Sequence, residues 1–211
     1  MNLPRASKIV CVGRNYAAHA KELGNDVPER PLIFLKPPSA LIGDGEAILL
    51  PDASHRVEHE GEIGVVIGAR SRGVAEEDAM KAVAGFVPLN DVTARDLQKT
   101  DGQWTRAKGF DTFCPVGALS PADGVDWRSL EVTCTVNGEI RQHGSANQMV
   151  FGIPFLIAYI SSIMTLEPGD IIATGTPEGV GPLNEGDAVS VDIPGVGRVS
   201  STVRRRNTER P

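Results

Sequence analysis

Cysteine is scarce in this chain of 211 residues, with three in all, and histidine is hardly more frequent, with four. Cys11, Cys114 and Cys134 lie far apart and are odd in number. That pattern fits neither a disulfide framework nor a close-spaced zinc site. Free cysteines are typical of a reducing compartment, so we expect a cytoplasmic protein.

The chain also lacks a hydrophobic run long enough to cross a membrane. Its most apolar segment, residues 149–164, contains Pro154 and falls short of the ~20 residues that a membrane-spanning helix needs. We expect a buried helix over residues 154–163, continued from a start near Ser145. Residues 1–8 hold no apolar stretch, so we expect no secretory signal and no membrane partner.

An excess of basic residues is missing as well. Lys and Arg number 21 against 27 Asp and Glu, which gives a net charge of -6. A surface with that surplus repels a phosphate backbone unless its basic groups cluster. The arginines at positions 204–206 follow no apolar pattern, and we interpret them as part of a solvated tail. Nucleic acid is therefore not an expected partner.

What the chain does contain is the composition of one globular domain. Apolar residues make up 41% and charged residues 23%, a balance that builds a substantial core. No repeat or low-complexity linker divides the sequence. We predict a single domain over residues 1–211, with residues 1–7 and 204–211 as frayed tails.

The expected fold class is α+β and rich in strands. The 23 glycines and 15 prolines demand many turns and short elements. Short apolar runs predict strands at residues 9–12, 33–35, 48–50 and 62–67, and one helix is expected at residues 76–83. Asn137-Gly138 indicates a hairpin between residues 132–136 and 139–142, and a second hairpin is expected between residues 188–193 and 199–203. Local strand pairing of this kind argues against a doubly wound parallel sheet.

Three acidic residues form a possible metal site. Glu60 and Glu62 are two residues apart, so on an extended strand both carboxylates project from one face. Asp91 ends another apolar run, where loops often present functional groups. Three oxygen donors without cysteine suit a hard ion such as Mg²⁺ or Mn²⁺. The alternative is that the glutamates lie on the solvated face of an edge strand.

A histidine and a glutamate are spaced to act together. His19 and Glu22 lie three residues apart in a short helix predicted over residues 16–23, so their side chains share a face. A carboxylate there can orient the imidazole as a general base requires, although surface pairs of this kind are commonly only solvated. The helix is too short to be stable alone, which is typical of a lid that orders over a bound molecule.

Five separated motifs, in this order, resemble the fumarylacetoacetate hydrolase superfamily. They are GRNYAAH at residues 13–19, FLKP at 34–37, HEGE at 59–62, NDVTARD at 90–96 and TGTPEGVG at 174–181. The resemblance spans nearly the whole chain and is to the compact members, which consist of the catalytic domain alone. It implies a mixed β-sheet roll with few short helices, and a homodimer. One departure is Pro38, since relatives often have Ser or Thr after the Lys-Pro pair.

The resemblance also implies roles for individual residues. The metal ligands of the superfamily fall on Glu60, Glu62 and Asp91, and its catalytic pair falls on His19 and Glu22. Further catalytic and substrate-binding roles fall on Lys108, Gln98, Arg14, Arg95 and Thr176. From composition alone, Lys108 would be a surface lysine.

The function that we expect first is metal-dependent cleavage of the carbon-carbon bond in acylpyruvates such as fumarylpyruvate or acetylpyruvate, releasing pyruvate. A dication would stabilise the negative charge of the departing enolate. Oxaloacetate decarboxylation, or isomerisation or decarboxylation of dienoic diacids in aromatic catabolism, are alternatives on the same site. A binding module without catalysis would need neither His19 nor Glu22, so their presence favours a small-molecule enzyme acting on keto acids.

Overall fold

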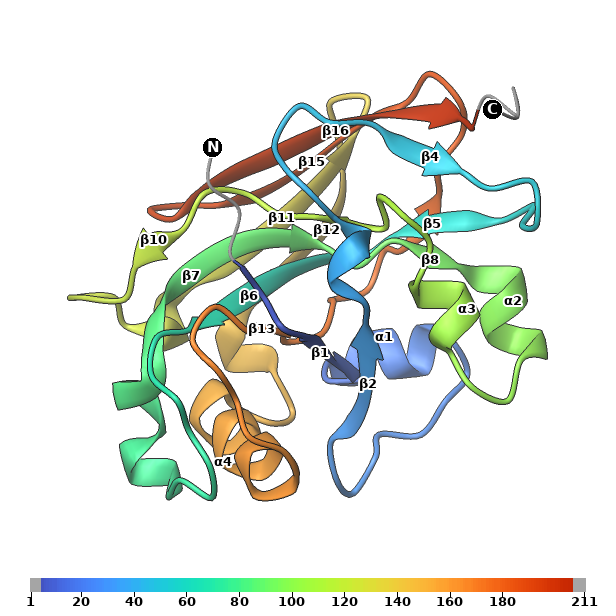
Figure 1. The fold of residues 1–211 in the computed structure, drawn as a ribbon. Helices are drawn as coiled ribbons and strands as arrows, with labels where there is room; N and C mark the ends of the chain where they lie inside the picture. Colours follow the sequence, from blue (N-terminus) through green and yellow to red (C-terminus); the bar gives the residue numbers. More distant parts are fainter. Residues whose placement is uncertain (1–4, 207–211) are drawn as a thin grey trace.

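The computed structural model describes residues 5–206 and places a six-stranded mixed sheet at the centre of the molecule (Figure 1). Its strand order is β10-β7-β6-β13-β1-β2, with β1 and β13 parallel and the other neighbours antiparallel. The bounds are β1 Ile9–Gly13, β2 Leu32–Lys36, β6 Gly61–Ile67, β7 Val83–Asn90, β10 Ser120–Pro121 and β13 Ile171–Ala173. Every residue of β6 is buried, because both faces of this sheet are covered.

A second, five-stranded sheet has the order β12-β11-β15-β16-β4. Its bounds are β4 Ile48–Leu50, β11 Glu131–Val136, β12 Glu139–Ser145, β15 Ala188–Ile193 and β16 Gly197–Arg205. Both predicted hairpins are present, β11 with β12 and β15 with β16. Asn137 and Gly138 have φ values of 53° and 80°, as a type I′ turn requires. Alternating burial in β15 turns its apolar face toward the first sheet.

Two small sheets complete the strand arrangement of the described residues. One has the order β14-β5-β8 and the other pairs β3 with β9. Their bounds are β3 Leu41–Ile42, β5 Val57–His59, β8 Thr93–Ala94, β9 Cys114–Pro115 and β14 Gly181–Pro182. Because β5 runs into β6 and β8 follows β7, the chain between these strands is held at the same end of the central sheet.

The helices are few and short, as expected. Their bounds are α1 Ala17–Glu22, α2 Arg95–Thr100, α3 Thr105–Lys108 and α4 Ile153–Ile163. Figure 1 shows α1, α2 and α3 at one end of the sheets, near β2 and β8, while α4 lies below the central sheet and β15 and β16 lie above it. Within residues 5–206, no helix is long and apolar enough to cross a membrane.

Two helix predictions need correction. The segment predicted as a helix over residues 76–83 is a 3-10 helix, Glu76–Ala82, that leads directly into β7. The helix expected to start near Ser145 begins only at Ile153, with Gly152 as its N-cap and Pro154 in its first turn. Ser145 instead caps a separate 3-10 turn, Ala146–Gln148, through a capping box with Gln148.

The prediction of frayed tails is wrong where the structure describes the chain ends. Arg204 and Arg205 belong to β16 and pair with Leu49 and Leu50 of β4. Near the other end, the backbone N–H and the hydroxyl of Ser7 both donate to Asp170 Oδ1, at 2.9 and 2.7 Å. Backbone hydrogen bonds in a sheet and a buried acceptor give both ends fixed positions. The remaining predicted tail positions, residues 1–4 and 207–211, lie outside the described residues.

Asp170 therefore links the start of the chain to β13. Its buried carboxylate also accepts from the backbone N–H groups of Lys8 and Glu167, at 3.1 and 2.8 Å, and pairs with the Lys8 ammonium. Burial raises the pKa of Asp170, but the donors from Lys8, Glu167 and Ser7 outweigh it and hold the pKa below its ordinary value.

Asp170→Ala should lower the free energy of unfolding at pH 7 by about 2–4 kcal/mol, since several buried donors lose their acceptor. A depressed pKa stabilises the folded state above the unfolded-state value, about 3.9, and the benefit disappears as the pH falls through the folded-state value. Urea unfolding from pH 7 down to about pH 2 should show a constant difference in the free energy of unfolding between wild type and variant above about pH 4, and a narrowing difference below it. Exposed Asp123, replaced by Asn, is the control, and a difference that does not change with pH would contradict the assignment.

Candidate active site

Three carboxylates converge at the end of the central sheet. Glu60 lies between β5 and β6, Glu62 lies in β6, and Asp91 directly follows β7. The antiparallel register places Gly61 opposite Asn90, and the backbone N–H of Asp91 donates to the carbonyl of Glu60 at 2.8 Å. One ligand oxygen of each carboxylate lies within 4.8 Å of the others, and all three residues are buried. The alternative of a solvated edge strand is thereby excluded.

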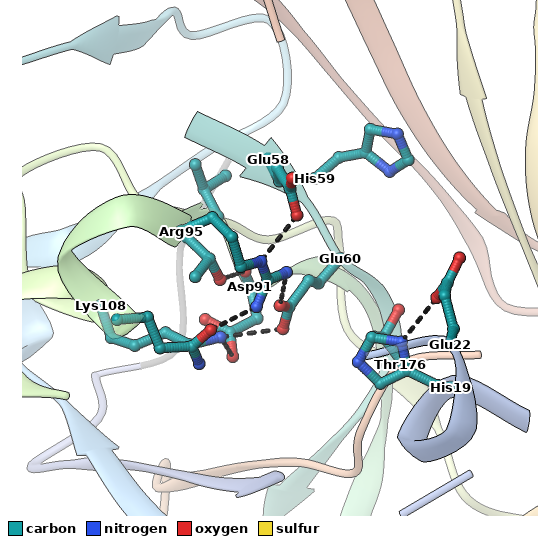
Figure 2. A network of polar contacts seen from close by, with 12 residues as sticks. His19, Glu22, Glu58, His59, Glu60, Asp91, Arg95, Lys108 and Thr176 are labelled. Atoms are coloured by element: carbon teal, nitrogen blue, oxygen red, sulfur yellow. Dashed lines mark hydrogen bonds and ion pairs between the residues drawn. The ribbon is translucent and has the colours of Figure 1, made fainter. Parts of the chain in front are cut away.

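Three cationic side chains surround these carboxylates (Figure 2 shows Arg95 and Lys108). The ammonium of Lys108 bridges Glu60 Oε2 and Asp91 Oδ2, at 2.8 and 2.7 Å. Arg95 Nη2 pairs with Glu60 Oε1, and Lys36 Nζ lies 2.6 Å from Asp91 Oδ1. Every oxygen of Glu60 and Asp91 thus has a charged donor. Buried carboxylates require such partners, because an unpaired charge away from water is costly.

The pKa values of Glu60 and Glu62 are shifted in opposite directions. Burial raises the pKa of Glu60, but Lys108 and Arg95 outweigh it and lower the pKa far below its ordinary value. Burial and the nearby charges of Asp91 and Glu60 raise the pKa of Glu62 well above its ordinary value. The only hydrogen-bond donor to Glu62 within the described residues is the backbone N–H of Gly175, at 2.8 Å. A hard dication among the three carboxylates would remove this repulsion, so the donor set fits Mg²⁺ or Mn²⁺.

The predicted histidine–glutamate pair forms on α1, facing this cluster (Figure 2). His19 Nδ1 lies 3.0 Å from Glu22 Oε2, and His19 is 5% exposed. The other oxygen of Glu22 accepts from the backbone N–H of Gly179 at 2.9 Å. Because the carboxylate only accepts, Nδ1 carries the proton, and in the neutral imidazole Nε2 then keeps its lone pair. A helix of six residues is thus tied to the loop that follows β13.

Between α1 and the carboxylates lies a cavity of about 580 Å³. The remaining predicted site residues all line it: Arg14, Arg95, Gln98, Lys108 and Thr176. Arg95 donates to the side-chain oxygen of Gln98, so Gln98 faces the cavity beside an ion-paired arginine. Thr176 is buried, and its hydroxyl donates to the carbonyl of Gly61 at 2.8 Å. Lys108 is 1% exposed and not the surface residue that composition indicates.

Some site residues were not identified from the sequence. Lys36 is buried against Asp91 and Val92, although only its place in the FLKP motif marked it. Glu58 pairs with Arg95 at 2.6 Å, and His59 donates to Gln142 at 2.9 Å. Burial lowers the pKa of His59. Glu58 is marked in the sequence only by its place beside the predicted ligands, and His59 only by its place in the HEGE motif. Gln142 gave no signal, since its neighbours in β12 are exposed.

Comparison with known proteins identifies the family of this chain. A sequence model of the family described as fumarylacetoacetate (FAA) hydrolase C-terminal matches residues 8–204. The chain belongs to this family. The mixed sheets and few helices are those of its solved members, and the predicted fold class is confirmed.

Three relatives show the range of activities in the family. The mitochondrial oxaloacetate tautomerase of Arabidopsis thaliana is 49% identical over 207 residues, covering 96% of this chain and 93% of the relative. The mitochondrial oxaloacetate decarboxylase of Dictyostelium discoideum is 48% identical, covering 90% and 89%. The crystal structure of fumarylpyruvate hydrolase from Pseudomonas aeruginosa, in complex with Mn²⁺ and pyruvate, is 33% identical with a TM-score of 0.90, covering 95% and 91%. This chain is therefore a member of an enzyme family.

Lys36→Met should lower the free energy of unfolding by about 3–5 kcal/mol, because Asp91 loses one of its two buried cationic partners and its Oδ1 is left without a charged donor. Added Mn²⁺ should raise the melting temperature of the variant more than that of the wild type, since a dication restores the missing positive charge. Thermal unfolding with Mn²⁺ and with EDTA measures both effects. Lys81→Met removes an exposed lysine paired with Asp78 and should change neither quantity. An equal loss of unfolding free energy in Lys36→Met and Lys81→Met would show that the folded state does not depend on the pairing of Lys36 with Asp91.

Proposed function

We propose that this protein is a divalent-metal-dependent enzyme for dianionic 2-keto acids of the oxaloacetate class, and that it moves a proton at the carbon beside the keto group. The observation that carries the proposal is the His19–Glu22 pair, which faces a buried cluster of carboxylates and cations across one cavity. The relatives named as oxaloacetate tautomerase and oxaloacetate decarboxylase support this substrate class.

The charge of the cavity floor supports a dianion. Glu60, Glu62 and Asp91 are balanced by the cations of Lys36, Lys108 and Arg95. These three carboxylates would hold Mg²⁺ or Mn²⁺, which when bound would polarise the keto acid as a Lewis acid. A dication added to a balanced floor leaves a double positive charge, and a substrate with two carboxylates neutralises it.

The walls of the cavity offer a place for the second carboxylate. Arg14 and Lys99 both line the cavity, and neither makes an ion pair with a described residue. Arg56 also lines it, but its guanidinium is already 2.6 Å from Glu58. A carboxylate at the far end of a short keto acid would therefore pair with Arg14 or Lys99.

His19 is the group that moves the proton in this proposal. Its Nε2 lone pair can accept a proton from the carbon beside the keto group and return it at another position. Glu22 stabilises the imidazolium while the proton is held, and the N–H of Gly179 keeps the Glu22 carboxylate in place. Lys108 and Arg95 hold the negative charge of the floor in a fixed arrangement, so no large reorganisation is needed.

Carbon-carbon bond hydrolysis of acylpyruvates is the second candidate. It is favoured by the fumarylpyruvate hydrolase that has the same fold. In that reaction His19 Nε2 would take a proton from water instead of from carbon, and the water would attack the distal carbonyl of the substrate. The same residues serve both reactions, so only assays on defined substrates separate them.

The test is an assay of the purified protein with Mg²⁺ or Mn²⁺ against oxaloacetate, acetylpyruvate and fumarylpyruvate. Loss of the enol absorbance reports tautomerisation, and pyruvate reports decarboxylation or hydrolysis. We expect turnover of oxaloacetate that EDTA abolishes. Pyruvate formed from the acylpyruvates, without any action on oxaloacetate, would instead favour hydrolysis.

His19→Asn should lower kcat by about 10²–10⁴-fold, the usual contribution of a general base, and change KM little. Glu22→Gln should lower kcat less, because the imidazole keeps a hydrogen-bond acceptor. Mn²⁺ affinity should be unchanged in both variants, since neither residue is among the three carboxylates. Unchanged kcat in His19→Asn would exclude the proposed proton transfer.

A further inference from the structure

Gln142 is a buried polar side chain on β12, where Gly144 is the only other buried residue. In β12 its neighbours Arg141 and His143 are exposed, and Ile140 is 69% exposed, whereas Gln142 is 1% exposed. Residues two apart on a regular strand share a face, so Ile140 and Gln142 should be alike. They differ because the register shifts there: Cys134 pairs with Gln142, while Thr135 pairs with Ile140. This β-bulge turns Gln142 into the molecule.

The amide of Gln142 uses its full hydrogen-bonding capacity. Its oxygen accepts from the backbone N–H of Gly61 and from His59 Nδ1, each at 2.9 Å. Its nitrogen donates to Thr176 Oγ1 and to the carbonyl of Pro177, each at 2.7 Å. An amide has two acceptor and two donor positions, so the four bonds permit only one orientation of this side chain.

Three of these groups form a closed ring around Gly61, the residue between the two metal-ligating glutamates. Gly61 donates to Gln142, Gln142 donates to Thr176, and Thr176 donates to the carbonyl of Gly61 at 2.8 Å. Both peptide groups that flank Gly61 are therefore fixed from the side opposite the strand pairing with β7. Those peptides set the directions in which Glu60 and Glu62 leave the backbone.

The same amide also holds the loop to which α1 is tied. Gln142 binds Thr176 and Pro177, and two residues later the N–H of Gly179 donates to Glu22. Gly179 has φ of 96°, and a Cβ there would lie 2.0 Å from the carbonyl oxygen of Arg141. Only glycine fits against the bulge of β12 in this way. The bulge therefore positions the Gln142 amide and also provides the surface against which the loop at residues 176–179 packs.

We propose that Gln142 is a positioning residue, which holds the metal-ligand segment His59–Glu62 and the loop at residues 176–179 in one fixed arrangement. It touches neither substrate nor metal and acts through Gly61 and Thr176. Figure 2 shows His59 pointing away from the cluster of Glu60, Arg95 and Lys108, toward the side from which Gln142 holds it. The inference rests on the metal site of the proposed function.

The test is calorimetric titration of Mn²⁺ into Gln142→Met, a change that keeps the length of the side chain and removes all four hydrogen bonds. Mn²⁺ affinity should weaken by about 10–100-fold, as is typical when a partner behind a metal ligand is lost. At saturating Mn²⁺, kcat should also fall by about tenfold or more, with KM within about threefold, because the Glu22 anchor shifts. His143→Met, an exposed neighbour on the same strand, is the matched control and should bind Mn²⁺ as the wild type does.

A second pair of variants tests the ring without changing Gln142. Thr176→Val removes the hydroxyl and should weaken Mn²⁺ binding, whereas Thr176→Ser keeps the hydroxyl and should restore it. If Thr176 acted through packing alone, Mn²⁺ affinity would not depend on whether its side chain has a hydroxyl. This pair decides the matter even where Gln142→Met does not fold.

Mn²⁺ affinity within about twofold of the wild type in Gln142→Met and in Thr176→Val would overturn the inference, because the loss expected for such a partner is larger. The calorimetric test of Gln142 does not depend on whether the proposed function is correct. A wild type that binds Mn²⁺ but turns over no keto acid would refute the function, while the calorimetric series would still decide the role of Gln142.

Discussion

The structure depends on the burial of three carboxylates at one point, which is possible only because three cations are buried with them. Glu60, Glu62 and Asp91 lie at the junction of β5, β6 and β7, away from water. Their mutual repulsion would unfold this junction or protonate it if the cations were absent. Much of the local fold therefore provides the contacts that balance the charges of these carboxylates.

The cations come from three places that are far apart in the sequence. Lys36 ends β2, Arg95 begins α2 and Lys108 ends α3. Two helices too short to be stable alone are therefore held in place by the charges that they carry to the carboxylates. The ion pairs that balance the charge of the site are therefore the same contacts that hold α2 and α3 in place.

Above this floor, a single carboxylate links the proposed base to a loop. Glu22 uses one oxygen to orient His19 and the other to bind the backbone of Gly179. The arrangement explains how relatives named as tautomerase, decarboxylase and hydrolase can share one architecture. In the proposed function, the floor and the base would serve all of these reactions, whereas the cavity wall, which includes Arg14, Lys99 and Trp104, would select the substrate.

The sequence by itself determined the features that depend on neighbours along the chain. Alternation and turn residues gave the two hairpins, and a spacing of three residues gave the contact between His19 and Glu22. The convergence of the three carboxylates followed from spacing together with motifs shared with a family. Only the tertiary structure decided the partners of those groups. Contacts between residues 34 to 83 positions apart, such as Lys36 with Asp91, hold Lys36, Glu58 and Gln142 in place. The inward turn of Gln142 depends on a bulge that no local pattern marks. Local preferences fix which way a short segment bends, but the burial of a charge or an amide is set by whichever distant segments pack around it.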